Sequence, residues 1–304
     1  MRIVSLLPAA TDLVATLGLL PSLVGRTHEC DWPAGETGDI PVVTAATLDT
    51  GRMTSREISD AVGGAAHRGS ALYALDTGLL AELAPDVVLT QDLCDVCAVS
   101  YRQVSEAVGV LDGDGPLVVN LRPRNLDDVL GSVRQVADVL GVPDTGRERV
   151  AALRARLDEV RARVAGLPSP KVAAIEWLDP PWPAGHWVPD QIAAAGGTAL
   201  LAPSGAHTTS TTWSEVASAG PEVVLFMPCG FPPRRTVAEL GARADRPWAE
   251  LPAVEAVWVL DGPAHFNRPG PRLVRGVEVL AEVLHGVGDG LDAGEAQRVA
   301  GRLG

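Results

Sequence analysis

The sequence is poor in aromatic residues and has no excess of positive charge. Aromatic side chains make up 4% of the 304 residues, and the formal net charge is −13. Basic residues form no cluster beyond Arg234-Arg235 and the dispersed arginines of residues 147–163. A surface that follows a nucleic-acid backbone needs clustered Lys and Arg. No nucleic-acid partner is therefore expected.

Long apolar stretches are missing as well. No segment approaches the roughly 20 apolar residues that a bilayer-spanning helix needs. Residues 1–8 place a single arginine before a short apolar run, which predicts a first β-strand and not a secretory leader. We therefore expect a cytoplasmic protein with no membrane partner.

Cysteine is scarce, and several well-known catalytic signatures are absent. The four cysteines are Cys30, Cys94, Cys97 and Cys229. In a large chain from a reducing compartment they are poor candidates for structural disulfides, which leaves free thiols, metal ligands or a redox pair. The sequence contains no P-loop, no G-x-G-x-x-G after a strand and no G-x-S-x-G elbow.

The composition that remains is that of a globular α/β protein. Hydrophobic residues make up 46% and charged residues 21% of the chain, and its length suggests two domains. Short apolar runs alternate with segments of helical period, which indicates parallel sheets covered on both faces. The predicted strands are residues 3–7, 23–26, 87–90, 117–120, 172–176, 223–226 and 257–260.

A long amphipathic helix is predicted between the two halves. Residues 146–166 carry apolar side chains at spacings of three and four, namely Val150, Leu153, Leu157, Val160 and Val164. We expect an N-terminal lobe over residues 1–141, a linking helix over 142–168 and a C-terminal lobe over 169–304. Residues 44–75 show no clean period and are expected to form a helix and a loop.

Polar and reactive residues gather after the predicted strands. Ligands of open parallel sheets bind beyond the carboxyl ends of the strands. Thiolates there suit zinc, copper(I) or an iron–sulfur centre, although a free cysteine is commonly a buried, inert thiol. The candidate metal ligands are Cys30, Cys94, Cys97, Cys229 and His28.

Acid–base and aromatic candidates follow the same rule. Glu176 and His186 could act as acid or base, with a salt bridge or a hydrogen-bonded loop histidine as the structural alternative. The scarce tryptophans concentrate near predicted strand ends and could form a flat ligand wall, or ordinary packing at the edge of the core. They are Trp32, Trp177, Trp182, Trp187 and Trp213. His265 could be part of a stacking wall, whereas His67, His207 and His285 are assigned structural roles.

Five ordered blocks of the sequence resemble the vitamin B12 and iron-siderophore receptors of ABC importers. They are Arg2-Ile3-Val4-Ser5-Leu6-Leu7-Pro8, Leu23-Val24-Gly25 leading to Asp31-Trp32-Pro33, Leu83-Ala84-Pro85-Asp86, Trp213-Ser214-Glu215-Val216 leading to Pro221-Glu222-Val223, and Phe266-Asn267-Arg268-Pro269-Gly270. The resemblance implies two Rossmann-like lobes joined by one backbone helix, with the ligand held in the cleft between them. It also points to a signal-less, cobalamin-binding-like branch.

The resemblance further implies which residues contact a corrinoid. Trp182 and the pair His265-Phe266 match the positions of the family's aromatic contacts, although a receptor of this type can carry tryptophan in place of His265. Receptors that dock on a permease present one glutamate per lobe. Gly78 stands at the first of these positions and Glu215 at the second, so the sequence argues against docking on an ABC permease.

Three functions follow, and we favour the first. The protein is expected to bind a corrinoid or another metal chelate in the cytosol, through Trp32, Trp177, Trp182, His186, His265, Phe266 and Arg268. The alternative is a metalloenzyme or metallochaperone in which the cysteines and His28 hold zinc or an iron–sulfur cluster in the same cleft. An ABC importer receptor is the third, disfavoured reading.

Overall fold

The computed structural model describes residues 1–67, 73–91, 115–243, 247–251 and 254–301. The chain divides into two compact units. Unit 1 comprises Met1–Met53, Glu57–Pro123 and Asp128–Val150, and unit 2 comprises Thr54–Arg56, Arg124–Asp127 and Ala151–Gly304. The last boundary falls within helix α6 (Pro143–Val164), inside the segment predicted to link two lobes.

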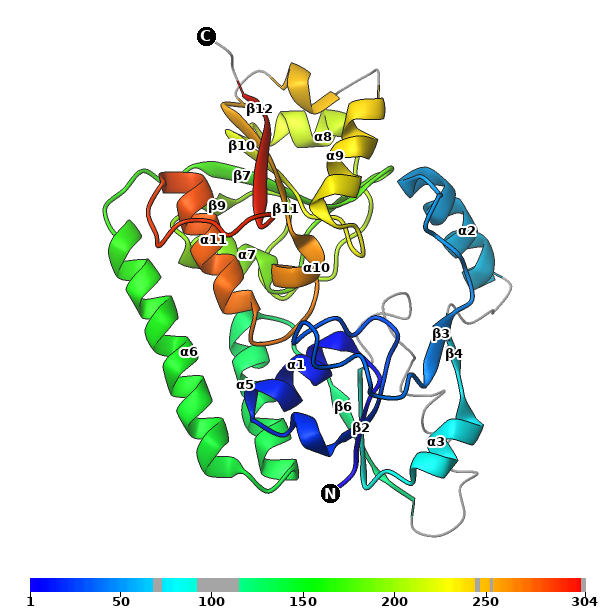
Figure 1. Cartoon of the computed structure of the whole chain (residues 1–304). Coiled ribbons are helices and arrows are strands. Elements are labelled where there is room, and N and C mark those ends of the chain that lie inside the picture. Colours follow the sequence, from blue (N-terminus) through cyan, green and yellow to red (C-terminus); the bar gives the residue numbers. More distant parts are fainter. Residues whose placement is uncertain (68–72, 92–114, 244–246, 252–253, 302–304) are drawn as a thin grey trace. The chain divides into compact units, whose positions relative to one another are not determined.

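Unit 1 is built on a parallel sheet with the strand order β2-β1-β5-β6 (Figure 1). Its strands are β1 (Ile3–Ser5), β2 (Leu23–Arg26), β5 (Val87–Gln91) and β6 (Leu117–Leu121). The helices of this unit include α1 (Pro8–Thr16), α3 (Thr77–Leu83) and most of α5 (Leu126–Val139), and η1 (Leu20–Ser22) is a short 3-10 turn. On one face of the sheet, Val4 and Val88 pack with Leu80 of α3 in a buried cluster. The four strands predicted for the N-terminal half are confirmed.

The segment 44–75 contains more strand than the sequence predicts. Strand β3 (Thr44–Ala46) pairs antiparallel with β4 (Tyr73–Leu75), and α2 (Ser55–His67) lies between them in the chain. The expected helix is present, but the two strands are additions. Each has three residues, which is too short to show the two-residue alternation that identifies a strand.

Unit 2 contains a larger, mixed sheet. Strands β9, β7, β10 and β11 are parallel, whereas β8 and β12 pair antiparallel with β7 and β11. The strands are β7 (Lys171–Leu178), β8 (Pro181–Pro183), β9 (Thr198–Ala199), β10 (Val223–Phe226), β11 (Ala256–Leu260) and β12 (Ala296–Gly301). The predicted α/β fold class with parallel sheets is therefore confirmed, and the two antiparallel strands are additions.

Helices and turns connect the strands of unit 2. They are α7 (Val188–Ala194), α8 (Trp213–Ser218), α9 (Pro233–Ala242), the 3-10 turn η2 (Pro247–Glu250), α10 (Gly262–His265) and α11 (Leu273–His285). Helix α8 begins with a capping box, in which the side chain of Thr212 accepts from the backbone of Glu215 and the Glu215 carboxylate accepts from the backbone of Thr212. Helix α10 begins directly after β11, so it sits at the carboxyl end of a parallel strand.

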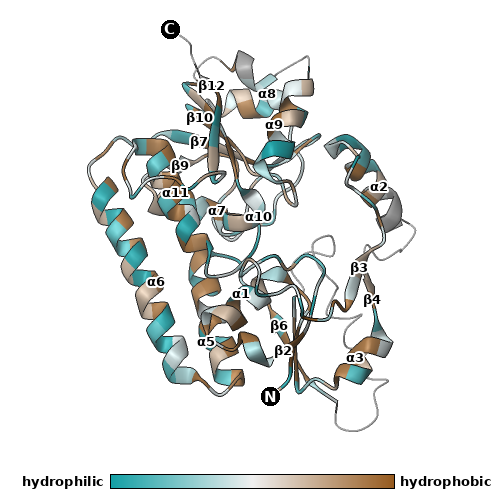
Figure 2. Cartoon of the chain, viewed as in Figure 1, coloured by the Kyte–Doolittle hydropathy of each residue, from teal (hydrophilic) through white to brown (hydrophobic). Residues whose placement is uncertain are grey.

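Helix α6 is the long amphipathic helix that the sequence predicts. Its apolar positions are buried, namely Val150, Leu153, Leu157, Val160 and Val164. Hydrophobic and hydrophilic residues alternate along it in Figure 2, as expected for a helix that is covered on one side. Proline is tolerated in the first turn, so the helix starts at Pro143, three residues earlier than predicted.

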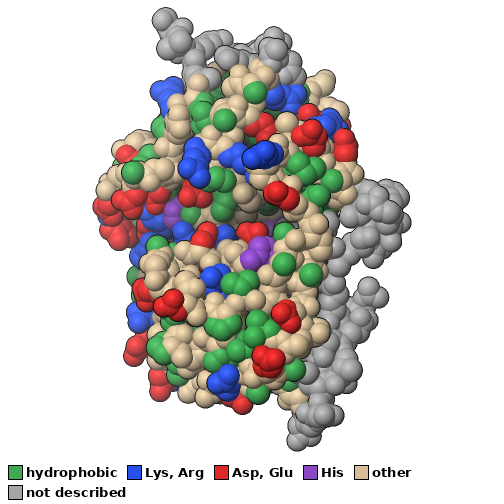
Figure 3. Space-filling model, turned by 45° about the vertical axis from the view of Figure 1, so that its right-hand side comes forward, with side chains coloured by type: hydrophobic (Ala, Val, Ile, Leu, Met, Phe, Trp, Pro, Cys, Tyr) green, Lys and Arg blue, Asp and Glu red, His purple; other side chains and the backbone are tan. Residues whose placement is uncertain are grey.

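The charged residues of the chain lie mostly on its surface. On the face drawn in Figure 3, Lys and Arg side chains are interspersed with Asp and Glu side chains. Among the described residues, no helix combines the length and the hydrophobicity that crossing a bilayer requires.

Candidate functional site

A hairpin of unit 2 brings two of the predicted ligand-binding tryptophans together. Strand β7 continues to Leu178, and β8 folds back on it so that Trp177 is paired with Trp182. Residues directly opposite each other in an antiparallel pair project from the same face of the sheet. Both indoles are half-buried, so each presents part of its ring surface to solvent.

Hydrogen bonds hold both indole rings in place. The Nε1 atom of Trp182 donates to Oγ1 of Thr208 at 2.9 Å, and this hydroxyl donates to the carbonyl oxygen of Pro183 at 2.8 Å. The Nε1 atom of Trp177 donates to the carbonyl oxygen of Ser55 at 3.3 Å. Phe231 meets Trp177 edge to face with ring centroids 5.2 Å apart. The rings therefore form a fixed aromatic wall, made of Trp177, Trp182 and Phe231.

His186 follows this hairpin in an unusual backbone conformation. Its φ is 50°, a left-handed value that non-glycine residues rarely adopt. Two backbone hydrogen bonds hold it there: its N–H donates to Ala206 and its carbonyl accepts from Gly205, both at 2.8 Å. A Cβ atom at Gly185 would lie 2.5 Å from the carbonyl oxygen of Ala206. This close approach of the two segments requires glycine at position 185.

The imidazole of His186 lies between two other rings. It stacks on Trp187 with centroids 5.5 Å apart and planes 28° apart, and it meets His207 with centroids 5.6 Å apart. Burial lowers the pKa of His186, and the nearby charges of His207 and Arg124 lower it further. His186 is therefore neutral at pH 7 and can act as a base or a metal ligand.

Glu176, the other acid–base candidate, lies within β7 and not at its end, because the strand continues for two more residues. Its carbonyl oxygen accepts a hydrogen bond from the backbone N–H of Cys229 at 3.1 Å. Both residues are half-buried. The structure thus brings Glu176 and Cys229 together on adjacent segments, and their predicted roles stay predictions.

The structure encloses His265 and Phe266, the aromatic contacts that the resemblance implies. His265 is 8% exposed and Phe266 is 1% exposed. Their carbonyl oxygens accept hydrogen bonds from Gln191 at 3.0 Å and from Trp187 at 2.6 Å. A ligand-binding role for this pair stays a prediction, as it does for the half-buried Arg268.

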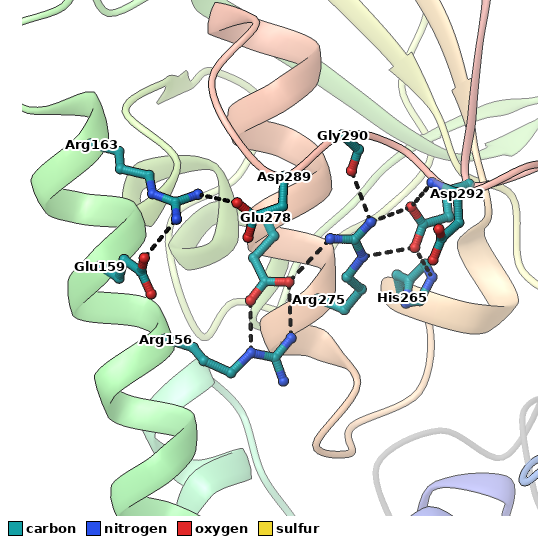
Figure 4. Close-up of polar contacts among 10 residues, drawn as sticks. Arg156, Glu159, Arg163, His265, Arg275, Glu278, Asp289, Gly290 and Asp292 are labelled. Atoms are coloured by element: carbon teal, nitrogen blue, oxygen red, sulfur yellow. Dashed lines mark hydrogen bonds and ion pairs between the residues drawn. The ribbon is translucent and has the colours of Figure 1, made fainter.

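An ion-pair network surrounds the His265 side chain (Figure 4). Glu295 lies 3.3 Å from Nε2 of His265 and accepts two hydrogen bonds from Arg275, at 2.8 and 2.7 Å. Arg275 also contacts Glu278, which Arg156 of α6 binds through two further hydrogen bonds. Burial lowers the pKa of His265, and Arg272 adds to this effect, although Glu295 and Asp261 oppose it.

The predicted metal ligands of unit 1 are occupied by hydroxyl groups. The Sγ atom of Cys30 lies 2.9 Å from Oγ1 of Thr11, and burial raises the pKa of this thiol to about 11. The Nδ1 atom of His28 lies 2.8 Å from Oγ1 of Thr44, and its Nε2 lies 3.4 Å from Glu29. Trp32 is half-buried in the same segment. A protonated Cys30 is a poor metal ligand, because metals bind the thiolate.

The predicted zinc or iron–sulfur centre is not tested as a whole. Cys94 and Cys97 lie outside the described residues. Within the part of the chain that the structure describes, no three His, Cys, Asp or Glu side chains come together in a group that could hold a metal ion. The cysteine-ligated centre stays a prediction.

Sequence reasoning missed two residues of this site. His207, assigned a structural role, lies beside His186, and Thr208 anchors Trp182. The turn residues Pro203, Ser204 and Gly205 precede both and could have indicated a loop that folds back. Which strand end that loop returns to is a matter of tertiary structure.

The comparisons with known proteins agree with this fold. A periplasmic heme binding protein from Pseudomonas aeruginosa superimposes with a TM-score of 0.69 at 19% identity, covering 100% of this chain and 99% of that one. A periplasmic vitamin B12 binding protein from Vibrio cholerae gives 0.66 at 19% identity, covering 92% and 94%. A periplasmic heme-binding protein from a Roseiflexus species gives 0.63 at 24% identity, covering 92% and 96%.

Sequence comparison gives the family. No curated protein matches the chain in sequence. The model of a family described as "Periplasmic binding protein" matches residues 3–264, which is most of the chain. The protein therefore belongs to the periplasmic binding protein family.

Proposed function

We propose that this protein binds a planar metal chelate of the corrinoid or heme class and does so without chemical turnover. The observation that carries this proposal is the cross-strand pair Trp177 and Trp182, fixed at the carboxyl end of β7 next to His186. Membership of the family supports a binding role, and the printed names of the similar structures include vitamin B12 and heme as ligands.

The chemistry of the aromatic wall fits a flat, mostly apolar ligand. Indole rings offer a large apolar surface with one polar edge. Here that polar edge is already satisfied, because both Nε1 atoms donate to oxygen atoms of the protein. A ring system that stacks on the wall would lose little side-chain freedom on binding, since the rings are fixed beforehand.

We further propose that the protein works in the cytosol. Cys30 is a free, buried thiol and Cys229 a free, half-buried one, and unpaired thiols are typical of reducing compartments. Fractionation of cells that express the chain from its natural gene would test this. Recovery with a periplasmic or surface marker would contradict it.

Titration with chelates tests the binding proposal. Cobalamin, hemin and a ferric siderophore would each be added to the purified protein while tryptophan fluorescence and ligand absorbance are followed. We expect saturable binding of at least one planar chelate, weakened by Trp182→Ala. Trp248→Phe is the matched control, because Trp248 is buried against Phe226 away from the aromatic wall.

Two results would overturn the proposal. One is the absence of binding for all three chelates. The other is binding that is as tight in the double variant Trp177→Ala/Trp182→Ala as in the unmodified protein, provided that both proteins are folded by circular dichroism.

A further inference from the structure

We propose that His186 and His207 form a two-imidazole donor pair for a divalent transition-metal ion of the cobalt, nickel, copper or zinc type. No metal-binding role for either residue is implied by the family match, and the sequence assigned His207 a structural role. The inference deepens the proposed function and rests on it in one respect: it names the coordination state of the metal that a bound chelate would carry.

Geometry is the first support. The ring centroids lie 5.6 Å apart and the planes are tilted by 59°. Imidazole donors bind such metals at roughly 2.0–2.1 Å, so two rings at this separation can contribute to one coordination sphere after small side-chain rotations. Both residues lie in segments that the backbone hydrogen bonds between His186, Gly205 and Ala206 fasten together.

The way His186 is held is the second support. Trp187 covers one face of its ring, and its backbone keeps a φ of 50°. Left-handed residues other than glycine persist where the surrounding structure imposes them and are concentrated at functional sites. The Nδ1 atom of His186 is enclosed, yet it has no hydrogen-bond partner among the described residues. A buried polar atom without a partner is costly, and a ligand would remove that cost.

Other histidines of the chain differ in this respect. His285 places Nε2 3.0 Å from the carbonyl oxygen of Ala195, and His28 places Nδ1 2.8 Å from Thr44. Those contacts explain the positions of both rings. The neutral state of His186 at pH 7 adds to the contrast, because only a neutral imidazole can donate a lone pair to a metal.

Two protein donors leave a metal ion short of ligands. Cobalt, nickel, copper and zinc take four or more ligands in proteins, and the described residues offer no third His, Cys, Asp or Glu in the same group. The remaining positions must be filled by groups that arrive with the metal. The pair is therefore suited to a chelate whose metal keeps exchangeable coordination positions, and unsuited to one that is fully saturated.

Zinc alone is the direct probe, because it is diamagnetic and needs no chelate. Metal-free protein would be titrated with Zn²⁺ while the imidazole resonances of all histidines are followed by NMR. We expect the signals of His186 and His207 to move together and to saturate. By calorimetry, His186→Ala and His207→Ala should each weaken this binding by at least about tenfold. His285→Gln is the control and should bind as the unmodified protein does.

The results separate this inference from the proposed function. Unmoved signals of His186 and His207, or equal Zn²⁺ affinity in the two alanine variants, would overturn the donor pair even if cobalamin or hemin still binds. Binding of Zn²⁺ at the pair without binding of any chelate would leave the pair in place and overturn the proposed function. Since both alanine variants could lose local structure, His207→Gln serves as a milder second variant.

Discussion

The Nε2 atom of His265 lies 3.3 Å from the Oε1 atom of Glu295, and both side chains are more than nine-tenths buried. Arg275 holds the same carboxylate through two hydrogen bonds. Burial alone would raise the pKa of Glu295, but the bonds from Arg275 and from the backbone of Asp292 lower it below its usual value. A carboxylate and an imidazole are thus enclosed together, with opposite consequences for stability at low pH.

Stability should fall as the pH drops below about 6.5, the ordinary pKa of histidine in an unfolded chain. His186 and His265 both have lowered pKa values in the folded protein. The unfolded chain therefore takes up protons first, which favours unfolding until the pH passes below the folded pKa values. Urea unfolding at pH 7.5, 6.5 and 5.5 would measure the loss.

The variant His265→Asn tests the cause of that loss. It removes one of the two titrating groups, so the difference in unfolding free energy between pH 7.5 and 5.5 should shrink. The groups that face His265 are Glu295, Asp261, Arg272 and Arg275, and they stay unchanged. An undiminished pH dependence in this variant would show that other groups cause it.

Glu295→Gln should destabilise unit 2 by about 1–3 kcal/mol, because Arg275 loses its strongest partner in a poorly hydrated place. Glu159→Gln is the matched control. Glu159 also binds an arginine, Arg163, but its side chain is 60% exposed. An exposed pair of this kind contributes less than about 1 kcal/mol. Equal losses for the two variants, measured by chemical denaturation, would contradict the proposed importance of the buried network.

Gly185→Ala should separate the segment of His186 from that of His207. The new Cβ would lie 2.5 Å from the carbonyl oxygen of Ala206 and 2.8 Å from Cγ2 of Thr208. Overpacking of this kind costs about 1–3 kcal/mol. We expect a lower melting temperature together with loss of the ring contact between the two histidines, detected by NMR.

Gly241→Ala is the counterpart in helix α9. A Cβ at Gly241 meets no atom within 4 Å, and alanine in a helix is favoured over glycine by about 1 kcal/mol. Its melting temperature should stay equal or rise. A similar fall for both variants would mean that the clash at Gly185 is not the cause.

Cys30 should react slowly with iodoacetamide in the folded protein at pH 8. Its thiol is buried beside Thr11 and its pKa is raised to about 11, so little of the reactive thiolate is present. Peptide mass spectrometry after short exposure would compare native and denatured protein. Equally rapid labelling in both states would show that the thiol is exposed and ionised, as a metal ligand would be.

The strands were predictable because burial on both faces gives them continuous apolar runs. Runs such as residues 223–226 are strands with the expected bounds. Strand β8 was not predictable, because two of its three residues are proline, which is unfavourable within a sheet. Strand β12 contains Gln297 and Arg298, which interrupt an apolar pattern. Its position is set by pairing with β11.

The candidate site was predictable in its residue types and not in its pairings. The rule that ligands bind beyond strand ends correctly drew attention to Trp182 and His186. The pairing of Trp177 with Trp182 depends on the register of a hairpin, and the contact of His186 with His207 depends on the path of a loop. Neither register nor loop path is encoded in a local pattern. The enclosure of His265 likewise results from packing against Gln191 and Glu295.

The place of β1 in unit 1 has a consequence for how the chain folds during synthesis. This strand leaves the ribosome first, but it pairs on one side with β5, where Ile3 lies opposite Val87. Pairing across such a sequence separation is slow, because a long loop must close before any contact forms. Until then the strand exposes an unpaired edge, to which other chains can add. The growing chain of unit 1 is therefore expected to need protection from aggregation until β5 and β6 have emerged.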